Sequence, residues 1–556
     1  MMINIQEYIR RAGSFCGIAA AITAAALTSC SDDWNDHYDD ATSGAGNGSL
    51  WQALSTQDNL SNFASVVKAC GYDAMLNGSQ TYTVFAPDNN AISKDEADQL
   101  IAKFQQQETN GVRTNENTVV RQFLQNHIAL YKNPVSSLTH KTITLMNGKY
   151  AELTDSTLDG HRILTSNALF GNGLLFSLGH TMDYTPNVFE YLGSDPELDS
   201  VYQFLDSHSV YEFNEAKSVP GEIIDGVTHY LDSVSQLRND LLSTFGLIDS
   251  EDSTYWFVAP TNAEWKRLTA EYEPYFNYPN NVAHRDSMAY TNARKSIVCG
   301  AFFSRTSNPD AAFQDSAVST QALPARLRML MNQEDNYYIY YKPFEQGGIF
   351  HGTEDIACSN GHVRKASQFN ISKLSTFVQS NKVEAEAMQY QDTIINAIEP
   401  LTDREIPSNN PFYGKVSGNT FVEVVPSTPD ASVQVVYELP NLLSSLEYDI
   451  YAVFVPATAF DTLDVAETEK QCRVRCVLRY PDQNGRESSR RFPRNINVNT
   501  AAVDTVKLVS AAQIPTCTYG LTDAKAKIEI QSGTSGATLR LDCIIIKPSE
   551  QEATNQ

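Results

Sequence analysis

One short pattern occurs twice in this chain and constrains its fold more than any other feature. Residues 82–92 read YTVFAPDNNAI and residues 255–265 read YWFVAPTNAEW, an offset of 173 residues. In each copy strand-forming residues run into a proline, and a residue able to cap a helix follows. That residue is Asp88 in the first copy and Thr261 in the second, where Glu264 has the spacing of a capping box. The same strand, stop and helix start are therefore predicted twice.

Two further anchors repeat in the same order. Residues 119–128 (VVRQFLQNHI) and 292–301 (NARKSIVCGA) keep the offset of 173. Asn172-Gly173 and Asn360-Gly361 each precede an apolar run, at an offset of 188, so the second copy holds about 15 inserted residues between these anchors. Three ordered anchors in each half indicate that one fold was duplicated within the chain.

The anchors resemble the motifs of the fasciclin (FAS1) domain family. The family's first box, approximately T-V-F-A-P-T-N-x-A-F, is matched by residues 83–92 and 257–265, and its closing box by 172–176 and 360–363. The resemblance covers residues 48–373. It implies a compact α+β wedge of helices around a small mixed sheet in each copy, with domain 1 at 48–193 and domain 2 at 194–373.

The family's middle box ends in a histidine, which His127 matches. In the family a Tyr-His pair has been linked to receptor contacts, but this chain has Asn126 in place of the tyrosine and Gly300 in place of the second histidine. We therefore expect His127 to be a buried, hydrogen-bonded side chain. Domain 2 also carries alternating residues around Asp225-Gly226, which predict a hairpin at 219–234.

The N-terminus has the layout of an export signal. Arg10 and Arg11 precede an apolar run at 12–26, which is too short to span a membrane and suits a secretory signal. The run ends in Leu-Thr-Ser-Cys, which resembles the lipobox of bacterial lipoproteins. The resemblance implies a signal peptide at 1–29 and a lipidated, palmitate-bearing Cys30. The alternative is a plain signal peptide with a cysteine there by chance.

The residues after Cys30 are acidic and small. Ser31-Asp32-Asp33 resembles the surface-export signal of Bacteroidota lipoproteins, although a solvated acidic linker would have the same composition. Residues 30–47 are rich in Asp, Ser and Gly, which predicts a flexible tether. Together these features predict a lipid-anchored protein of the outer membrane that is exposed on the cell surface.

Beyond residue 381 short apolar or alternating runs replace the mixed pattern. Pro, Asn, Gly and Asp separate them, and such spacing without helices predicts a β-sandwich at 381–549. The predicted fold class is therefore α+β, with two FAS1-type wedge domains followed by an all-β, jelly-roll-like sandwich. The runs lie at 420–425, 432–439, 448–455, 472–480, 505–509, 527–530 and 539–546.

The two ends of this segment, VEAE at 383–386 and LDCI at 541–544, resemble the first and last strands of galactose-binding-like jelly rolls used as carbohydrate-binding modules. There, carboxylates at these strands hold a structural Ca²⁺, which prefers oxygen ligands. The resemblance implies Glu386 and Asp542 as ligands; the alternative is that Glu384 and Glu386 face solvent. No other cofactor is expected. Four aromatic residues of this segment have two possible roles, stacking on sugar rings or packing in the core: Tyr390, Phe412, Tyr413 and Tyr480.

Charge and catalytic motifs narrow the function. Lys and Arg number 41 against 66 Asp and Glu, for a formal charge of −25. This excess repels phosphate backbones and predicts that the protein has no basic face, so no nucleic-acid partner is expected. Residues 380–556 contain no histidine, and neither H-E-x-x-H nor G-x-x-x-x-G-K-[ST] occurs. The seven cysteines after Cys30 form no C-x-x-C pair, which favours buried free thiols.

Three functions fit these features. The first is a non-enzymatic surface lipoprotein for adhesion or glycan binding, in its sharper form accessory to an outer-membrane glycan-uptake system. The second is a structural or assembly subunit docked to an outer-membrane transporter. The third is a glycan-active enzyme with a carboxylate pair. The expected partners are the membrane, through the lipid, and a glycan or an extracellular or outer-membrane protein. The sequence assigns no ligand-binding residues.

Overall fold

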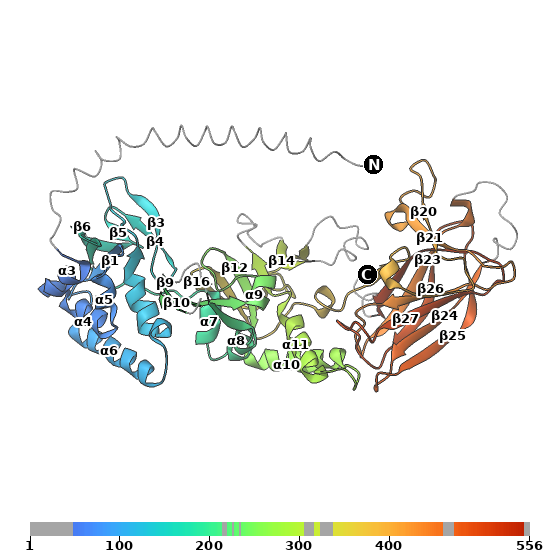
Figure 1. The fold of residues 1–556 in the computed structure, drawn as a ribbon, viewed down its shortest axis with the longest axis horizontal. Coiled ribbons are helices and arrows are strands. Elements are labelled where there is room, and N and C mark those ends of the chain that lie inside the picture. The colour runs from blue at the N-terminus through green and yellow to red at the C-terminus, as the bar shows by residue number, and fades with distance from the viewer. Residues whose placement is uncertain are drawn as a thin grey trace. The chain divides into compact units, whose positions relative to one another are not determined.

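A computed structural model describes residues 48–213, 219–224, 227–232, 235–304, 316–322, 337–459 and 472–549. Contacts divide the chain into two compact units, unit 1 at residues 1–185 and unit 2 at residues 186–556. Figure 1 shows their elements along the chain. The predicted signal peptide, Cys30 and the tether lie outside the described residues. Within the ranges given, no helix has the length and apolar character needed to cross a membrane.

Unit 1 contains a seven-stranded sheet of order β2-β1-β7-β6-β5-β4-β3. β1 (Tyr82–Pro87) runs parallel to β7 (Gly173–Leu178) and antiparallel to β2 (Ile128–Leu130). The other strands are β3 (His140–Thr144), β4 (Tyr150–Thr154), β5 (Thr157–Leu158) and β6 (His161–Phe170). The α-helices are α3 (Leu50–Thr56), α4 (Ser61–Ala69), α5 (Tyr72–Leu76) and α6 (Lys94–Thr109), with a π-helix at Val119–Leu124 and 3₁₀ turns at Asp58–Leu60, Thr114–Glu116 and Gln125–His127.

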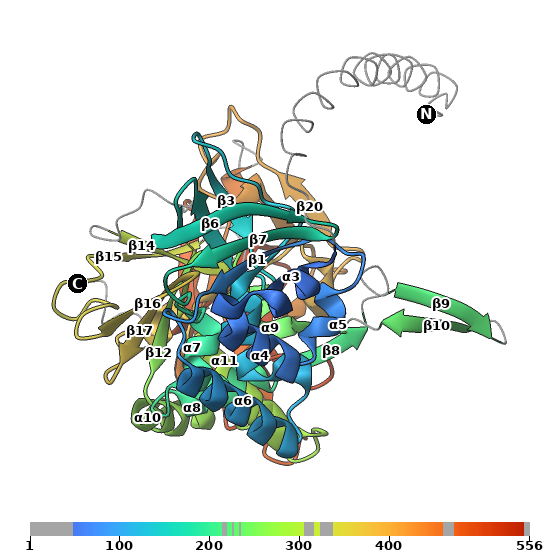
Figure 2. The ribbon, with the colours of Figure 1, turned by 90° about the vertical axis from the view of Figure 1, so that its left-hand side faces the viewer.

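The two faces of β1 pack into two different cores, because successive side chains of a strand point to opposite faces. Val84 packs with Leu54 and Phe63 of helices α3 and α4. Phe85 packs with Phe176, at 5.0 Å between ring centroids, on the side of β3 to β5. Figure 2 shows α3 to α6 gathered on one side of β1 and β7. The predicted wedge of helices and mixed sheet is thus present in unit 1.

The start of α6 differs from the sequence prediction. Asp88 was predicted to cap the helix, but its Oδ1 accepts hydrogen bonds from the backbone N–H groups of Asn90 (3.0 Å) and Ala91 (2.8 Å) in a turn. The cap is Ser93, five residues later, in a capping box with Glu96. The turn therefore lengthens the connection between β1 and α6, which the sequence pattern predicted to be direct.

The first half of unit 2 repeats the strand pairing of unit 1. β12 (Tyr255–Pro260) runs parallel to β17 (Gly361–Ala366) and antiparallel to β13 (Phe302–Ser304) in a sheet of order β13-β12-β17-β16. The helices are α7 (Val188–Ser194), α8 (Asp199–Asp206), α9 (Asp240–Phe245), α10 (Asn262–Tyr272) and α11 (Arg285–Val298), with a 3₁₀ turn at Glu273–Phe276. The other strands are β8 (Ser209–Phe213), β9 (Val219–Ile224), β10 (Val227–Asp232), β11 (Ser235–Asn239), β14 (Ser316–Ala322), β15 (Tyr337–Tyr341) and β16 (Glu354–Cys358).

In the stretch predicted to form a hairpin, β9 and β10 pair antiparallel, with Val227 opposite Ile224. They form a two-stranded sheet of their own, which Figure 2 shows projecting from the body. The predicted turn residues Asp225-Gly226 lie outside the described ranges.

The asparagines of the two Asn-Gly anchors make equivalent hydrogen bonds, which supports the tandem repeat. Asn172 Oδ1 accepts from the Leu50 N–H at 2.7 Å, and its Nδ2 donates to the carbonyls of Leu76 and Gly78, each at 2.8 Å. The corresponding bonds of Asn360 join it to the Val188 N–H (2.8 Å) and to the carbonyls of Ile248 (2.8 Å) and Ser250 (2.9 Å). The predicted domain boundary after residue 193 lies near the end of α7, whereas the contacts divide the chain after Thr185.

The C-terminal part of unit 2 is a two-sheet sandwich. One sheet has the order β20-β21-β28-β23-β26, with β18 paired to β28, and the other has the order β19-β22-β27-β24-β25. The first sheet contains β18 (Asn381–Glu384), β20 (Thr402–Glu405), β21 (Thr420–Val424), β23 (Glu447–Phe454), β26 (Asp504–Gln513) and β28 (Leu539–Pro548). The second contains β19 (Gln391–Ile395), β22 (Gln434–Leu439), β24 (Arg473–Pro481), β25 (Glu487–Asn497) and β27 (Ala526–Ser532). Short 3₁₀ turns lie at Lys373–Ser375, Met388–Tyr390, Ser417–Asn419 and Ala457–Ala459.

All seven predicted runs are strands of this sandwich. The strands that the runs did not include are β18, β19, β20 and β25, and the last three lie at the edges of their sheets. Edge strands keep more polar side chains than central strands, so their apolar period is weak. β20, for example, is exposed at every residue.

The second repeat and the sandwich share one hydrophobic core within unit 2. The Asn277 N–H donates to Ser444 Oγ at 3.0 Å, and the Asn277 carbonyl accepts from the Cys517 N–H at 2.7 Å. Beside them the buried Tyr278 hydroxyl donates to the Tyr519 carbonyl at 3.0 Å. The sandwich is therefore bonded directly to the second repeat.

Seven cysteines lie in the described ranges, all of them are free, and six are buried. Burial raises the pKa of thiols such as Cys70 and Cys299 to about 12, because it disfavours the thiolate. These cysteines are the inert core residues that the sequence predicted.

Candidate functional site

Three carboxylates meet where the first and last strands of the sandwich pair. Glu384 ends β18 opposite Cys543 of β28, and the Ala385 N–H donates to the Asp542 carbonyl at 2.9 Å. This pairing carries Glu386 to the same end of the sandwich. The Ser417 N–H lies 3.2 Å from both Asp542 oxygens, and the Ser417 hydroxyl donates to Glu384 Oε1 at 2.9 Å.

Burial dominates the electrostatics of this carboxylate cluster (Glu384, Glu386 and Asp542). Asp542 is 2% exposed, and burial raises its pKa to about 7. The negative charge of Glu384 also raises this pKa, whereas the hydrogen bond from Ser417 lowers it. Burial also raises the pKa of Glu386. The cation at the cluster is Lys382, whose Nζ lies 2.6 Å from Glu384 Oε1. Among the described residues, Lys382 is thus paired with Glu384 and also acts on Asp542.

The donor set fits a hard divalent cation. Glu384 Oε2 and Glu386 Oε2 are buried and accept no hydrogen bond from any residue that the structure describes. Uncompensated buried carboxylate oxygens are costly, and a bound cation would compensate them. Ligand atoms of Glu384, Asp542 and Cys543 lie within 4.8 Å of one another. Ca²⁺ prefers the oxygens to the sulfur, so the carboxylates would hold it.

The sequence-predicted pair is thus only partly the group that the structure brings together. Asp542 is in it, and Glu386 lies beside it, bonded to the Thr420 hydroxyl at 2.7 Å. Glu384, which like Glu386 was expected to face solvent in the alternative interpretation, supplies the nearer carboxylate and buries one of its oxygens. β18 ends at Glu384, opposite Cys543, so strand pairing places Glu384 beside Asp542, whereas Glu386 lies beyond the end of the strand. Calcium binding here stays a prediction.

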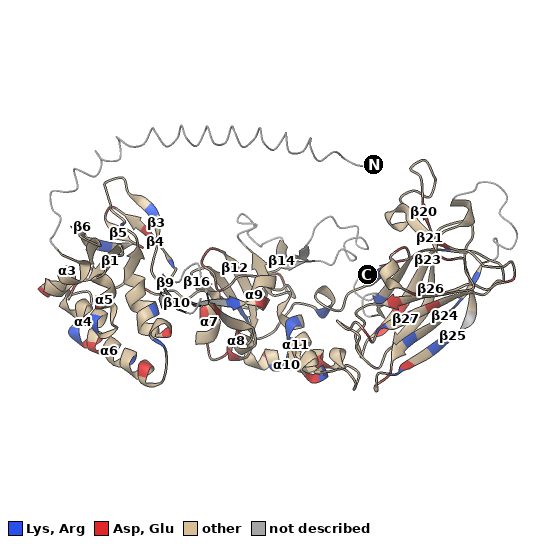
Figure 3. Ribbon diagram, viewed as in Figure 1, with Lys and Arg blue, Asp and Glu red and all other residues tan. Residues whose placement is uncertain are grey.

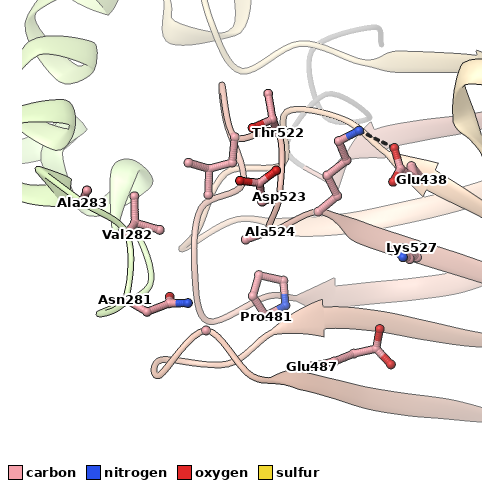
Figure 4. A pocket seen from close by; sticks show the side chains of 13 residues that line it. Asn281, Val282, Ala283, Glu438, Pro481, Glu487, Thr522, Asp523, Ala524 and Lys527 are labelled. Atoms are coloured by element: carbon pink, nitrogen blue, oxygen red, sulfur yellow. Dashed lines mark hydrogen bonds and ion pairs between the residues drawn. The ribbon is translucent and has the colours of Figure 1, made fainter.

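A second feature is a polar cavity of about 410 Å³ between the second repeat and the sandwich. Figure 4 shows Asn281, Val282 and Ala283 on one side of it and side chains of the five-stranded sheet on the other. Gly485 closes one wall at a φ of +76°, and a Cβ there would lie 1.9 Å from Asn281 Oδ1. The remaining lining residues are Glu438, Pro481, Glu487, Leu521, Thr522, Asp523, Ala524, Lys525 and Lys527.

Ion pairs hold the charged walls of this junction cavity. Glu438 pairs with Lys525, as the dashed line in Figure 4 marks. Lys527 Nζ lies 2.5 Å from Asp392, and Glu487 lies 3.1 Å from Arg479 Nη1. The cavity therefore offers both hydrogen-bond donors and acceptors in fixed positions, which suits a hydroxyl-rich ligand.

The outer face of the five-stranded sheet extends from this cavity. Apolar residues of β22, β27 and β24 point into the sandwich, so the alternate residues form the outer face. One row across it joins Gln434, Gln531 and Arg475, and Arg475 Nε donates to Asn495 Oδ1 at 2.6 Å. A neighbouring row ends with Val477 opposite Arg491.

The acidic excess of the whole chain does not extend to one segment of the sandwich. Residues 473–495, which form β24 and most of β25, hold seven arginines against one aspartate and one glutamate, a net charge of +5. Figure 3 shows stretches coloured for Lys and Arg along β24 and β25. A formal charge summed over the chain cannot reveal such a patch, because strand pairing gathers the arginines on one sheet.

The aromatic residues singled out in the sandwich differ in exposure. Tyr390 and Tyr480 are half-buried and pack against the main core, and Phe412 packs against a smaller one under Lys415. Tyr413 is 50% exposed. Tyr390, Tyr480 and Phe412 therefore pack at least partly against a hydrophobic core.

His127 of unit 1 is buried and hydrogen-bonded, as predicted. Its Nδ1 lies 2.7 Å from the Phe123 carbonyl, and its Nε2 accepts from the Met182 N–H at 2.9 Å. These partners require the neutral ring with the proton on Nδ1. Burial lowers its pKa to about 4, with the Phe123 carbonyl opposing that shift. At the corresponding Gly300 a Cβ would lie 2.6 Å from Thr376, so a histidine has no room there.

Comparison with known proteins agrees with part of the sequence resemblance. The model of the Fasciclin domain family matches residues 58–182, within unit 1. No curated protein is similar enough to the chain to be matched.

Several solved structures are similar to parts of the chain. A FAS1 domain pair from the insect cell adhesion molecule Fasciclin I is 13% identical, covers 57% of this chain and 97% of its own, and has a TM-score of 0.19. The CBM22-1 xylan-binding domain of Paenibacillus barcinonensis Xyn10C is 10% identical (31% and 93% covered, TM-score 0.21). A family 35 carbohydrate binding module from Clostridium thermocellum is 13% identical (31% and 99%, TM-score 0.20). Likenesses with TM-scores this low decide nothing about ligand or activity.

Proposed function

We propose that this protein is a non-enzymatic binding protein of the cell surface, and that its C-terminal sandwich binds a glycan. The observation that carries the proposal is the junction cavity with the outer sheet face beside it. Both offer amide, hydroxyl and charged groups held by ion pairs, and glycan hydroxyls need such donors and acceptors. The Fasciclin match at residues 58–182 supports an adhesion-type role for the repeats that carry the sandwich.

The coupling of the sandwich to the second repeat supports this arrangement. One wall of the junction cavity comes from residues 281–283 of the repeat, so the cavity needs both parts of unit 2. The bonds of Asn277 and Tyr278 keep the two walls in register. A binding site on such a rigid junction loses little conformational entropy when a ligand binds.

The proposal includes a lipid anchor at Cys30, an acidic export signal after it and an outer-membrane location. These rest on the sequence of residues 1–33 alone. A tether ahead of Gly48 would let the binding unit sample the space above the membrane and raise its effective concentration there. An accessory role in glycan uptake is the specific form of this proposal.

The test is a glycan array probed with the chain from residue 31 to residue 556. Binding to a defined glycan class, reduced by Gln434→Ala or Asn281→Ala, supports the proposal, because both side chains belong to the proposed surface. Asn90→Ala is the matched control, since Asn90 is exposed in unit 1. An array with no signal for any glycan contradicts it.

A second candidate, a subunit docked to an outer-membrane transporter, draws on exposed apolar side chains at one edge of the sandwich. Met388 is 76% exposed, Ile395 41% and Ile398 55%, and all three lie on or beside the edge strand β19. Exposed apolar residues on a sheet edge suit a protein contact. Capture of a stoichiometric membrane protein that Ile398→Lys abolishes, without glycan binding, favours this second function.

A further inference from the structure

The outer face of the five-stranded sheet carries positive charge that no described residue neutralises. Arg479 is paired with Glu529 at 2.5 Å and with Glu487 at 3.1 Å. Arg473 and Arg491 have no ion pair with any residue in the described ranges, and Arg475 has only the neutral Asn495 as a side-chain partner. Three guanidinium groups on β24 and β25 are therefore available to an anion.

Strand pairing places these arginines on the solvent side. Val474, Cys476 and Leu478 of β24 are buried in the sandwich, so Arg473 and Arg475 point away from it. Arg491 lies opposite Val477 and shares that outer side. All three arginines are exposed.

Amide side chains continue the arginine row across the sheet. Gln434 lies opposite Gln531, which lies opposite Arg475, and Asn495 follows on β25. The row thus reads amide, amide, guanidinium, amide over four adjacent strands. Neighbouring strands lie about 4.8 Å apart, so the row extends over roughly 14 Å, the length of two to three sugar units.

We infer that this face binds a glycan that carries carboxylate or sulfate groups, with Arg473, Arg475 and Arg491 contacting the anions and the amide row contacting the hydroxyls. The inference rests on the proposed function and narrows its ligand class. Planar guanidinium groups pair with carboxylate and sulfate oxygens through two parallel hydrogen bonds, and amides both donate to and accept from hydroxyls.

A glycan fits this face better than a nucleic acid does. Recognition of single-stranded nucleic acid relies on aromatic side chains that stack on bases. The outward positions of β22, β27 and β24 hold amide, charged and aliphatic residues and no aromatic ring. An acidic glycan carries a few anionic groups among many hydroxyls. The three arginines among amide side chains on this face match that distribution.

The test is affinity electrophoresis of the chain from residue 31 to residue 556 through gels that contain polygalacturonate, chondroitin sulfate or neutral dextran, with an oligothymidylate titration alongside. We expect binding to at least one acidic glycan, weakened by raising salt from about 50 to about 200 mM. The variant R473Q/R475Q/R491Q is expected to bind roughly tenfold or more weakly, because three charge-assisted contacts are lost.

The matched control is K103Q/K132Q/R162Q, which removes the same charge from exposed positions of unit 1 and should leave binding unchanged. Unchanged unfolding temperatures of both variants show that folding is intact. If neutral and acidic glycans bind equally, or the arginine variant binds normally, the inference fails and the proposed function stands. If no glycan on these gels or on the array binds, both fail. Tighter binding to oligothymidylate overturns the inference in favour of a nucleic-acid ligand.

Discussion

Asn172 holds the backbone N–H of Leu50 at 2.7 Å across 122 residues, and in the second copy Asn360 holds Val188 in the same way at 2.8 Å. Each asparagine thus joins the first helix of a repeat to the strand that closes it. This shared hydrogen bond explains why the Asn-Gly anchor occurs in both copies of the sequence.

Replacing Asn172 with alanine is expected to destabilise unit 1 by about 3 kcal/mol, since it leaves the Leu50 N–H and the Leu76 carbonyl buried without their partner. Asn360→Ala should act in the same way on unit 2. Calorimetry of the chain from residue 31 to residue 556 would show a different transition lowered by each variant. Two variants that lower the same transition would contradict the expectation that each asparagine stabilises its own unit.

The glycine of the same anchor makes a separate prediction. A Cβ on Gly173, at a φ of +156°, would lie 2.1 Å from the Tyr82 carbonyl oxygen. Gly173→Ala must therefore push β7 away from β1, at a cost of about 3 kcal/mol or more. Gly160→Ala is the control, because its φ is also positive, at +80°, but nothing lies within 4 Å of its Cβ. It should cost about 1 kcal/mol in urea unfolding.

His127 makes the stability of unit 1 dependent on pH. Its pKa is about 4 when folded and 6.5 in the unfolded chain, so the unfolded chain binds more protons between these values. Stability is therefore complete above pH 6.5 and is lost as pH falls toward 4, by about 3 kcal/mol in all. A proton on Nε2 would also face the donating Met182 N–H.

Urea unfolding at about pH 7, 5.5 and 4.5 measures this loss, spanning the interval between the two pKa values. His127→Gln is less stable at neutral pH, but its stability should fall less on acidification. A parallel fall in both proteins would show that other groups cause the acid sensitivity.

Asp542 gives the sandwich the opposite dependence when no cation is present. Its pKa is raised by burial from 3.8 to about 7, so the folded state binds more protons between these values. Stability is then fully present below pH 3.8 and falls as pH rises toward 7, by about 4 kcal/mol. A bound Ca²⁺ would reverse that loss, so calcium should raise the unfolding temperature of unit 2 at pH 7 more than at pH 5.

Asp542→Asn is expected to abolish both the calcium effect and the pH effect in scanning calorimetry with and without a chelator. Asp430→Asn, at an exposed carboxylate on the loop between β21 and β22, should keep both. A calcium effect that survives in Asp542→Asn would place the ion elsewhere.

The proposed lipid anchor at Cys30 predicts the result of a membrane fractionation. Cys30→Ala should move the exported protein from the membrane fraction to the soluble fraction, because the proposed lipid is attached to the Cys30 thiol. Cys16→Ala, inside the predicted signal peptide, should leave the protein membrane-bound. Unchanged membrane attachment of Cys30→Ala would contradict the anchor.

Local patterns predicted much of the architecture. The Pro-ended strands β1 and β12, the Asn-Gly anchors and seven sandwich strands were readable because each depends on residues close in sequence. The predicted capping box of α10 is wrong, because Thr261 is the N-cap but its side chain makes no capping hydrogen bond. Glu264 instead accepts hydrogen bonds from Arg267 and from the Phe369 N–H. One neighbouring side chain and one distant backbone group therefore bind Glu264 in place of the predicted cap.

The sequence by itself determined that one fold was repeated and that a sheet-rich domain followed it, since strand period, proline stops and turn residues act locally. Only the tertiary structure decided which side chains share a site. Glu384 met Asp542, and Arg475 met Gln531, through pairing of strands more than 50 residues apart. Register between distant strands is set by packing of the whole core, and no local pattern encodes it.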